Sequence, residues 1–599
     1  MVMMGLDPES IAGLPVDKSC VVCAGPGTGK TRLLVRRLNF LGRNLCRPGA
    51  GVACITYTNT AADEISQRLE PGARPAFLGT IHSFLLQHIV YPYGWWLEGV
   101  PADFDLVTAG YAAPHLAWMQ AQRLISRQKA HVADVVAAFE MIGYDLDGNL
   151  RNLGQARLTQ EEMRAFVDRR LSEGQVSQQD VLWFAWKILS NPEWKHVLDA
   201  LSCRFSAILV DEFQDTTELQ YAVLRKLHEF GRTALFLVGD REQSIFSFAG
   251  SSLSTYEAAV GLFPTHPLFV SYRSTKHIVE FLNLFLDADR QLEAGAEWKD
   301  ADIPVYVLVG KVDDGERLQR FMELRSKHGL VGGGRKPEYL VLSHGTERAR
   351  HLAALSEGEP GGPGDVFERL EEKHPLLNAI VRDVLRARRL VDLGEKPRAF
   401  RSLDRGLSRL ILKANPGFGT PEEVGLTRNS WRVMVSAMLH EMSQLNDDDV
   451  RSWMASFAEK VKAVILRVGG KKSGRKLVLL GKLPENLRKK EPYRTAEALR
   501  RVDVSDELPR VVRTIHRAKG LEAEAVLVVA APGGQFTQWM NPCGSGKPRT
   551  EEARIGYVGF SRAMKLLCIA TDSMSLETRN MLACCPSVRV VELSGEGGR

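Results

Sequence analysis

Residues 19–31, SCVVCAGPGTGKT, constrain the fold more than any other part of this sequence. The apolar run from Cys20 to Ala24 is typical of a buried strand, and a helical pattern begins after the glycine-rich turn. A strand, a glycine-rich loop and a helix in this order are the context that a phosphate-binding loop requires. The segment therefore predicts a P-loop in an α/β domain, and a chance glycine-rich turn is the less favoured interpretation.

The residue types of this loop suit the phosphates of a nucleotide. Glycines let backbone N–H groups face the phosphates, and the N-terminus of the following helix adds a favourable dipole. We expect Lys30 to bridge the β- and γ-phosphates of ATP, and the hydroxyl of Thr31 to bind Mg²⁺. The predicted nucleotide-binding residues of this segment are Ala24, Gly25, Pro26, Gly27, Thr28, Gly29, Lys30, Thr31 and Arg32.

Two adjacent acids, Asp211 and Glu212, close the apolar run at 207–210. Phosphoryl transfer needs one carboxylate on the metal and a second that orients the attacking water. We assign Asp211 to Mg²⁺ and Glu212 to the general base. An acidic pair alone is weak evidence, but the string VDEFQDTTELQ around it is far more specific.

Further apolar runs alternate with helical patterns along the chain. Together with the first run they predict strands at 20–24, 52–57, 207–210, 234–238, 304–309, 339–342, 526–530 and 566–570. Strands that alternate with helices favour parallel sheets in an α/β fold. The stretches 82–205 and 365–500 are mostly amphipathic and helical instead, so they predict helical insertions.

Composition narrows the class of protein only a little. The chain has 599 residues, which suggests roughly four domains, and a formal net charge of +6, which permits a nucleic-acid partner without requiring one. The nine cysteines show no zinc-site spacing and fit buried thiols in a reducing cytosol. No apolar run approaches the ~20 residues of a membrane span. We therefore expect a cytoplasmic location and no membrane partner.

Seven strings resemble, in order, the motifs of UvrD/Rep-type DNA helicases of superfamily 1A. After the P-loop they are ITYTNTAADEI (55–65), LGTIHSF (78–84), VDEFQD (210–215), LVGDREQSIFSFAGS (237–251), SYRST (271–275), TIHRAKGLEAEAV (514–526) and EEARIGYVGFSRAMKLL (551–567). The resemblance implies an α/β fold with two RecA-like parallel-sheet P-loop motor domains, each with a mostly helical insertion. The implied segments are 1–82 and 206–265 for the first motor domain, 83–205 for its insertion, 266–355 and 506–599 for the second motor domain, and 356–505 for a divergent second insertion.

The resemblance also implies roles at the nucleotide. Gln243 would sense the γ-phosphate, Tyr272 would stack on the adenine, and Glu522 would contact the ribose. Arg273 and Arg562 would reach the γ-phosphate, where the charge that develops during transfer needs positive partners. Taken singly, either arginine would more often be a surface ion pair.

Single-stranded DNA is the partner that the resemblance implies. Stacking on aromatic side chains is worth ~1–3 kcal/mol per base and tolerates any sequence. For Phe246, packing in the core is an equal alternative, and Phe248 replaces the tryptophan usual in the family. The residues implied to contact DNA are Tyr57, Thr58, Asn59, His82, Phe246, Phe248 and His516.

Residues 365–500 do not resemble the family's usual second insertion, and two further departures from the family pattern affect the function. No glutamine precedes the P-loop, so selectivity for ATP over GTP stays open. Ala249 stands where the family has an arginine, so one contact to DNA or between the motifs is missing and we expect weaker motor coupling. The basic run from Lys471 to Arg494 is a candidate contact for duplex DNA or a partner, although a solvated loop is the favoured interpretation.

These patterns leave two functions in competition. The first is an ATP-driven motor that moves 3′ to 5′ on single-stranded DNA and separates duplex at single-strand/double-strand junctions, with the direction resting wholly on the resemblance. The second is a DNA-sensing ATPase that regulates a separate nuclease subunit, as in anti-phage operons such as Gabija. Since 29 residues follow Ala570, we expect no fused nuclease. The motif forms GYVGFSRA and GTIHSF argue against an RNA helicase and a 5′-to-3′ motor.

Overall fold

A computed structural model gives the fold. It describes residues 7–44, 49–70, 72–73, 75–101, 104–107, 111–126, 133–154, 156–246, 250, 253–295, 302–331, 338–356, 375–392, 394–412, 427–442, 450–467, 511–540 and 549–593. The chain divides into two compact units. The first unit comprises Met1–Gly358 and Arg510–Arg599, and the second comprises Glu359–Pro509.

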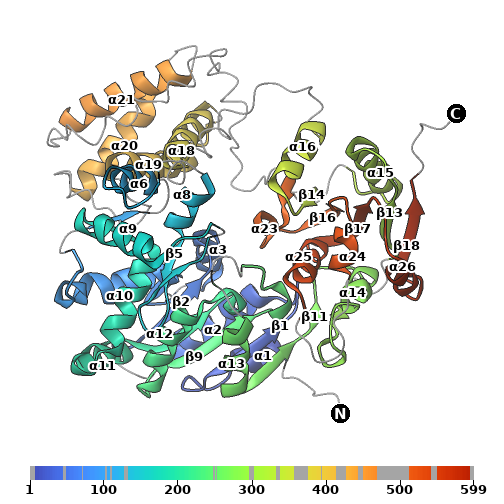
Figure 1. The fold of residues 1–599 in the computed structure, drawn as a ribbon, viewed down its shortest axis with the longest axis horizontal. Helices are drawn as coiled ribbons and strands as arrows, with labels where there is room; N and C mark the ends of the chain where they lie inside the picture. Colours follow the sequence, from blue (N-terminus) through green and yellow to red (C-terminus); the bar gives the residue numbers. More distant parts are fainter. Residues whose placement is uncertain are drawn as a thin grey trace. The chain divides into compact units, whose positions relative to one another are not determined.

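The first sheet has six parallel strands in the order β10-β1-β9-β8-β2-β3 (Figure 1). Strands β8 and β9 are buried along their whole length, as apolar runs in a parallel sheet covered on both faces must be. We call this sheet and its helices the first lobe. Its strands are β1 (Cys20–Ala24), β2 (Gly51–Thr56), β3 (Phe77–Thr80), β8 (Phe205–Val210), β9 (Ala234–Gly239) and β10 (Thr265–Leu268), and its helices include α1 (Pro8–Ala12), α2 (Lys30–Asn44), α3 (Asn59–Arg68), α4 (Ile81–Leu85), α12 (Glu218–Glu229) and α13 (Leu253–Leu262).

The second sheet is also parallel and six-stranded, in the order β15-β14-β16-β17-β13-β18. With its helices it forms the second lobe, and the two sheets confirm the predicted α/β fold class. Its strands are β13 (Val305–Val309), β14 (Tyr339–Ser343), β15 (Val512–Thr514), β16 (Ala523–Val529), β17 (Ala563–Thr571) and β18 (Val588–Glu592), and its helices are α14 (Lys276–Asn283), α15 (Asp314–Lys327), α16 (Thr346–Ser356), α23 (Ile515–Ala518), α24 (Gln535–Trp539), α25 (Glu551–Phe560) and α26 (Leu576–Ala583).

Four sheet strands, β3, β10, β15 and β18, are absent from the sequence-based predictions. Each is short or mixes apolar with charged residues, so no continuous apolar run marks it. Strand β10 even contains Pro267, which lacks an N–H, and it lies at the edge of its sheet, where such a residue is tolerated. A further short pair, β11 (Val270–Ser271) with β12 (Glu293–Ala294), follows the first sheet.

The chain between β3 and β8 is mainly helical, as predicted. Two small strand pairs also occur there: β4 (Asp105–Val107) with β7 (Gln175–Ser177), and β5 (Ile142–Tyr144) with β6 (Leu150–Asn152). Helices α9 and α10 both begin with capping boxes, at Thr159 and Ser177. The helices are α6 (Ala112–Ala121), α8 (Ala133–Glu140), α9 (Gln160–Ser172), α10 (Gln178–Ser190) and α11 (Lys195–Arg204).

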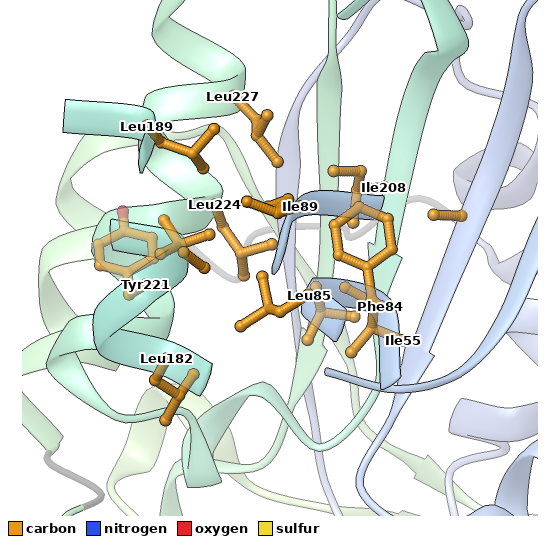
Figure 2. Packing of buried hydrophobic residues seen from close by; sticks show 14 of the residues in the cluster. Ile55, Phe84, Leu85, Ile89, Leu182, Leu189, Ile208, Tyr221, Leu224 and Leu227 are labelled. Carbon is orange, nitrogen blue, oxygen red and sulfur yellow. The ribbon is translucent and has the colours of Figure 1, made fainter. Parts of the chain in front are cut away.

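Helix α4 continues into a π-helical turn, η1 (Leu86–Val90), and the two bury one side of the first sheet. Figure 2 shows Phe84, Leu85 and Ile89 of this segment between strand residues and the facing helices. Ile55 and Ile208 lie on the sheet side, and Leu182, Leu189, Tyr221, Leu224 and Leu227 come from α10 and α12 (Figure 2). The shared core holds α4, which carries the predicted DNA contact His82, directly after β3.

The second unit is built from helices in the part that the structure describes. Its apolar core is rich in methionine and includes Met434, Met438 and Trp453, which are buried. Trp431 also donates from Nε1 to Asp404 Oδ1 at 2.7 Å. The helices are α18 (Pro375–Asp392), α19 (Lys396–Leu412), α20 (Arg428–Met442) and α21 (Val450–Arg467).

Several predictions fall outside the described residues. They concern Phe248, Ala249, the basic run from Lys471 to Arg494, and most of the expected boundary loop at 356–364. Within the described ranges, no helix is both long enough and apolar enough to cross a membrane.

Candidate functional site

The P-loop connects β1 to α2, as the sequence predicts. Gly27 and Gly29 adopt φ values of +72° and +86°, which glycine reaches without steric cost. Thr28 Oγ1 donates to the carbonyl of Gly25 at 2.9 Å, and Lys30 Nζ lies 3.5 Å from the same oxygen. Thr31 and Arg32 follow in the first turn of α2, with Arg32 exposed. The loop therefore has the glycine-dependent shape of a phosphate cradle.

A segment leading into the second lobe braces this loop. The hydroxyl of Ser271 donates to the carbonyl of Pro26 at 3.1 Å, and the N–H of Tyr272 donates to the carbonyl of Gly27 at 2.9 Å. A Cβ on Gly27 would lie 2.4 Å from Cβ of Arg273, so no larger residue fits without displacement. Tyr272 itself is 52% exposed.

Asp211 and Glu212 follow β8 at the carboxyl end of the sheet. The N–H of Asp211 donates to the carbonyl of Ile55, and Glu212 has a left-handed φ of +49°, which turns its side chain away from the strand direction. Burial raises the pKa of Asp211, and the neighbouring Glu212 charge adds to the rise. Burial also acts to raise the pKa of Glu212, but the charges of Lys30, Lys519 and Arg562 and the hydrogen bond from Gln214 together outweigh it, so this pKa is lowered.

Hydrogen bonds connect Glu212 to the second lobe. Gln214 Nε2 donates to Glu212 Oε2 at 2.5 Å, and Gln214 Oε1 accepts from the N–H of Asp240 at 2.8 Å. Gln243 Nε2 then donates to Asp240 Oδ2 at 2.6 Å, and Gln243 Oε1 accepts from Arg562 Nη2 at 2.8 Å. The predicted base, the predicted γ-phosphate sensor and the predicted second arginine thus belong to one network.

Arg273 and Glu522, both predicted at the nucleotide, contact each other. Arg273 Nε donates to Glu522 Oε2 at 2.7 Å, and its Nη1 donates to the carbonyl of Ser561 at 3.2 Å. Arg562 lies on the same side, and burial lowers its pKa to about 9, with the charge of Arg273 acting in the same direction. Arg562 therefore still carries its charge at neutral pH.

Three functional candidates have no role in the sequence-based interpretation: Gln214, Asp215 and Lys519. Lys519 Nζ donates to Asp215 Oδ2 and, at 2.6 Å, to the carbonyl of Gln243. Gln214 is fully buried, and a Cβ at Gly239 would lie 2.8 Å from its Oε1, so a glycine keeps room for it. All three lie in the strings VDEFQD and TIHRAKGLE, but a string does not reveal which partners its residues meet.

The predicted DNA contacts divide into two groups. Tyr57, Thr58 and Asn59 are exposed at the end of β2, and Thr58 also caps α3 by accepting from the N–H of Ala61. The rings of Tyr57 and Phe246 stack with centroids 5.2 Å apart and 19° between their planes. These residues lie at the carboxyl edge of the first sheet, where parallel-sheet proteins bind ligands.

The two histidines are more enclosed. His82 Nε2 is buried without a hydrogen-bond partner among the described residues, and burial lowers the pKa of His82 to about 4. His516 lies 6.1 Å from Phe246 and 5.5 Å from His344 between ring centroids, and burial lowers its pKa as well. Both side chains are therefore neutral near pH 7.

The donor set fits a nucleotide-bound Mg²⁺. The buried carboxylate of Asp211 has a raised pKa, which a neighbouring cation would relieve, and Thr31 supplies a hydroxyl oxygen. Within the described ranges, no cluster of three or more His, Cys, Asp or Glu side chains could hold a metal by itself. Mg²⁺ does not need one, because it binds through one or two protein oxygens together with substrate phosphates and water.

Two family models match the chain and together span more than half of it. Residues 8–264 match the UvrD/REP helicase N-terminal domain, and residues 497–573 match the UvrD-like helicase C-terminal domain. The first match contains the P-loop, Asp211 and Gln243, and the second contains Lys519 and Arg562. Each matched segment therefore contains residues of the network described above.

Curated relatives align with almost the whole chain. DNA helicase II of Escherichia coli K12 is 26% identical over 621 residues, covering 92% of this chain and 82% of that protein. ATP-dependent DNA helicase UvrD1 of Mycobacterium tuberculosis is 24% identical, covering 94% and 82%. ATP-dependent DNA helicase PcrA of Bacillus subtilis is 21% identical, covering 96% and 83%. The matched domains, the two parallel sheets and the order of the motifs agree: this chain belongs to the UvrD/Rep family of ATP-dependent DNA helicases.

Proposed function

We propose that this helicase moves 3′ to 5′ along single-stranded DNA, hydrolyses ATP as it moves, and separates duplex at the junction. The observation that carries the coupling is the hydrogen-bonded network from Glu212 in the first lobe to Arg562 in the second. Because its members come from both lobes, a change at the γ-phosphate changes how the lobes are held together. Closing and opening of two lobes is an established way to convert hydrolysis into motion.

The chemistry that we propose divides among residues of both lobes. Lys30 binds the β- and γ-phosphates, and Thr31 and Asp211 hold Mg²⁺, which would neutralise phosphate charge. Glu212, which its lowered pKa keeps ionised at neutral pH, orients the attacking water and accepts its proton. Arg273 and Arg562 stabilise charge on the transferred phosphoryl group, and Gln243 reports its presence to the second lobe through Arg562.

The DNA track that we propose runs along the carboxyl edge of the first sheet. Tyr57 is 46% exposed and stacks on Phe246, so a base can extend the same stack. Thr58 and Asn59 supply polar groups beside it, and His82 and His516 are neutral donors or acceptors at physiological pH. Such contacts do not depend on base identity, so we expect little sequence preference.

The decisive experiment compares ATP hydrolysis with and without single-stranded DNA. We expect strong stimulation by DNA, and its absence would count against a DNA motor. A strand-displacement assay on substrates with a 3′ or a 5′ tail then tests direction, and unwinding only from the 5′ tail would overturn the proposed polarity. DNA affinity should fall with added salt, because phosphate contacts release counterions.

A second candidate is an ATPase subunit that senses DNA and controls a separate nuclease. It is favoured by exposed aromatic side chains in the insertion of the first motor domain, since Trp95 and Trp96 are 63% and 38% exposed and exposed aromatics are common at protein interfaces. Co-purification with a nuclease from its native host, reduced by Trp95→Ala, would support this candidate. Strong unwinding by the isolated chain would favour the motor instead.

A further inference from the structure

One lysine of the second lobe contacts both ends of the proposed coupling route. Lys519 follows α23, and its ammonium reaches the first lobe, where it meets Asp215 and the carbonyl of Gln243. The side chains of Lys519 and Asp215 are 8% and 0% exposed, so water does little to screen the pair. The other oxygen of Asp215, Oδ1, has no hydrogen-bond partner among the described residues.

The same ammonium also lies against the proposed DNA track. Lys519 Nζ is 4.9 Å from the centroid of the Phe246 ring, within the range of a cation–π interaction. Phe246 in turn stacks on Tyr57, the exposed aromatic of the pair. A base that stacks on these rings therefore contacts an aromatic pair that Lys519 connects to the ATPase motifs.

On the ATPase side, the residues that Lys519 binds are adjacent or identical to residues that hold the predicted catalytic groups. Asp215 follows Gln214, whose amide holds Glu212, and the carbonyl that Lys519 binds belongs to Gln243, whose amide holds Asp240 and Arg562. A shift of Lys519 would thus act on the backbone of Gln243 directly, and on Gln214 through the side chain of its neighbour Asp215. Buried polar networks transmit such shifts because each member has few alternative partners.

We propose that Lys519 is the positioning residue through which single-stranded DNA accelerates ATP hydrolysis: it links the Tyr57–Phe246 ring pair to the carboxylate of Asp215 and the backbone carbonyl of Gln243. The inference rests on the proposed function, in which the rings contact bases and Glu212 and Gln243 act at ATP. It adds a specific route for the stimulation, and it assigns a role to a residue that the proposed function leaves without one.

A single substitution cannot separate this role from a merely structural one. Lys519→Met would leave the buried carboxylate of Asp215 without a counter-charge, which is strongly destabilising by itself. The double variant Lys519→Met/Asp215→Asn removes both charges, and such replacements are often tolerated. The double variant is therefore the informative one, and a thermal melt of the full chain checks that it folds.

The measured quantity is the ratio of ATPase rates with saturating single-stranded DNA and without DNA. If Lys519 carries the coupling, the folded double variant loses this stimulation by about fivefold or more, the lower end of typical coupling between sites. Lys565→Met is the matched control, because Lys565 forms a 2.9 Å ion pair with Glu524 in the same lobe. We expect Lys565→Met to keep the stimulation of the unmodified chain.

Phe246 supplies an independent arm. Phe246→Leu should reduce the stimulation even at saturating DNA, whereas Phe246→Tyr, which keeps an aromatic face, should largely restore it. Combining Phe246→Leu with the Lys519/Asp215 double variant should add little further loss, because residues in one route are not additive. Full additivity of the two losses would overturn the shared route.

The outcomes separate this inference from the proposed function. If the unmodified chain shows no stimulation by DNA, the proposed function itself fails. If the unmodified chain is stimulated and the double variant is stimulated equally, the Lys519–Asp215 pair is only structural and the inference is overturned. Equal loss of the rates with and without DNA would also overturn it, since the ratio would be unchanged.

Discussion

Arg562 of the second lobe donates from Nη2 to Oε1 of Gln243 in the first lobe at 2.8 Å. Both side chains are 2% exposed, so neither can exchange the bond for water without separation of the lobes. The amide nitrogen of Gln243, Nε2, donates to Asp240 Oδ2. The bond can therefore form only when the two lobes are in contact at this point.

Replacing Arg562 by alanine should remove most of the activity. We expect kcat to fall by about 10²–10³, the cost of losing one group that stabilises developing charge in a closed site. Steady-state ATPase assays at saturating DNA measure it. Arg579→Ala is a suitable control, because Arg579 is exposed and pairs with exposed Glu592. A kcat near that of the unmodified chain would show that Arg562 has no part in the chemical step.

Glu212→Gln should retain ATP and DNA binding and abolish turnover. The amide keeps the shape of the side chain but cannot accept the proton of the attacking water, so we expect kcat to fall by about 10²–10⁴. Nucleotide affinity and ATP hydrolysis are measured side by side, with Glu218→Gln, an exposed acid at the start of α12, as the control. Retained hydrolysis would mean that the base is assigned to the wrong residue.

Asp180→Ala should destabilise the helical insertion without touching the site. Asp180 and Arg170 form an ion pair with Nη1 and Oδ2 2.6 Å apart and a 3.0 Å hydrogen bond from Nη2 to Oδ1, and their side chains are 1% and 2% exposed. Removing one partner leaves a buried charge unpaired, which costs about 3–5 kcal/mol of unfolding free energy. Denaturant titration measures it, and exposed Asp168→Ala should change stability by less than about 0.5 kcal/mol. Equal effects of the two substitutions would contradict the argument.

His88 should make the unfolding free energy fall in mild acid. Its ring lies among Phe77, Phe84 and Phe205, and burial lowers its pKa to about 4, with Arg204 adding to the effect. The unfolded chain takes up the proton near pH 6.5, whereas the folded chain resists it, so protonation favours unfolding. Stability should therefore decline as pH falls from about 6.5 to about 4, by on the order of 2–3 kcal/mol from this group.

The variant His88→Leu isolates that contribution. Leucine suits the apolar surroundings and cannot be protonated, so its denaturant midpoint should change less between pH 7 and pH 4.5 than that of the unmodified chain. Tryptophan fluorescence during urea titration at several pH values provides the comparison. Identical pH profiles of the two proteins would exclude His88 as a source of the acid sensitivity.

Local sequence patterns predict the strands that consist of an unbroken apolar run. The strand-loop-helix at 19–31 and the apolar runs before Asp211 and Asp240 become β1, β8 and β9, because a strand buried on both faces needs an unbroken apolar run. Strand β18, with the sequence VRVVE, has no such run, so the sequence patterns do not predict it. Its place beside β13 depends on a partner that is 283 positions away in the register Val305↔Val588.

The site shows the same division. Family motifs indicated Lys30, Asp211, Gln243 and Arg562, and their roles at the nucleotide stay predictions. The partnership of Lys519 with Asp215 spans 304 positions and depends on how one lobe packs on the other. Neither sequence string predicts this ion pair, because the same lysine and aspartate could equally lie on the surface in contact with water.

The bond from the N–H of Tyr272 to the carbonyl of Gly27 has a consequence for fragments of this protein. A truncated chain ending before Phe269 would contain every residue of the glycine-rich loop, yet it would lack the scaffold that holds the loop's carbonyls in place. High affinity for the triphosphate then requires both lobes to be present and packed together. Dissecting the enzyme into separately expressed halves would weaken nucleotide capture even though no phosphate ligand in the loop had been removed.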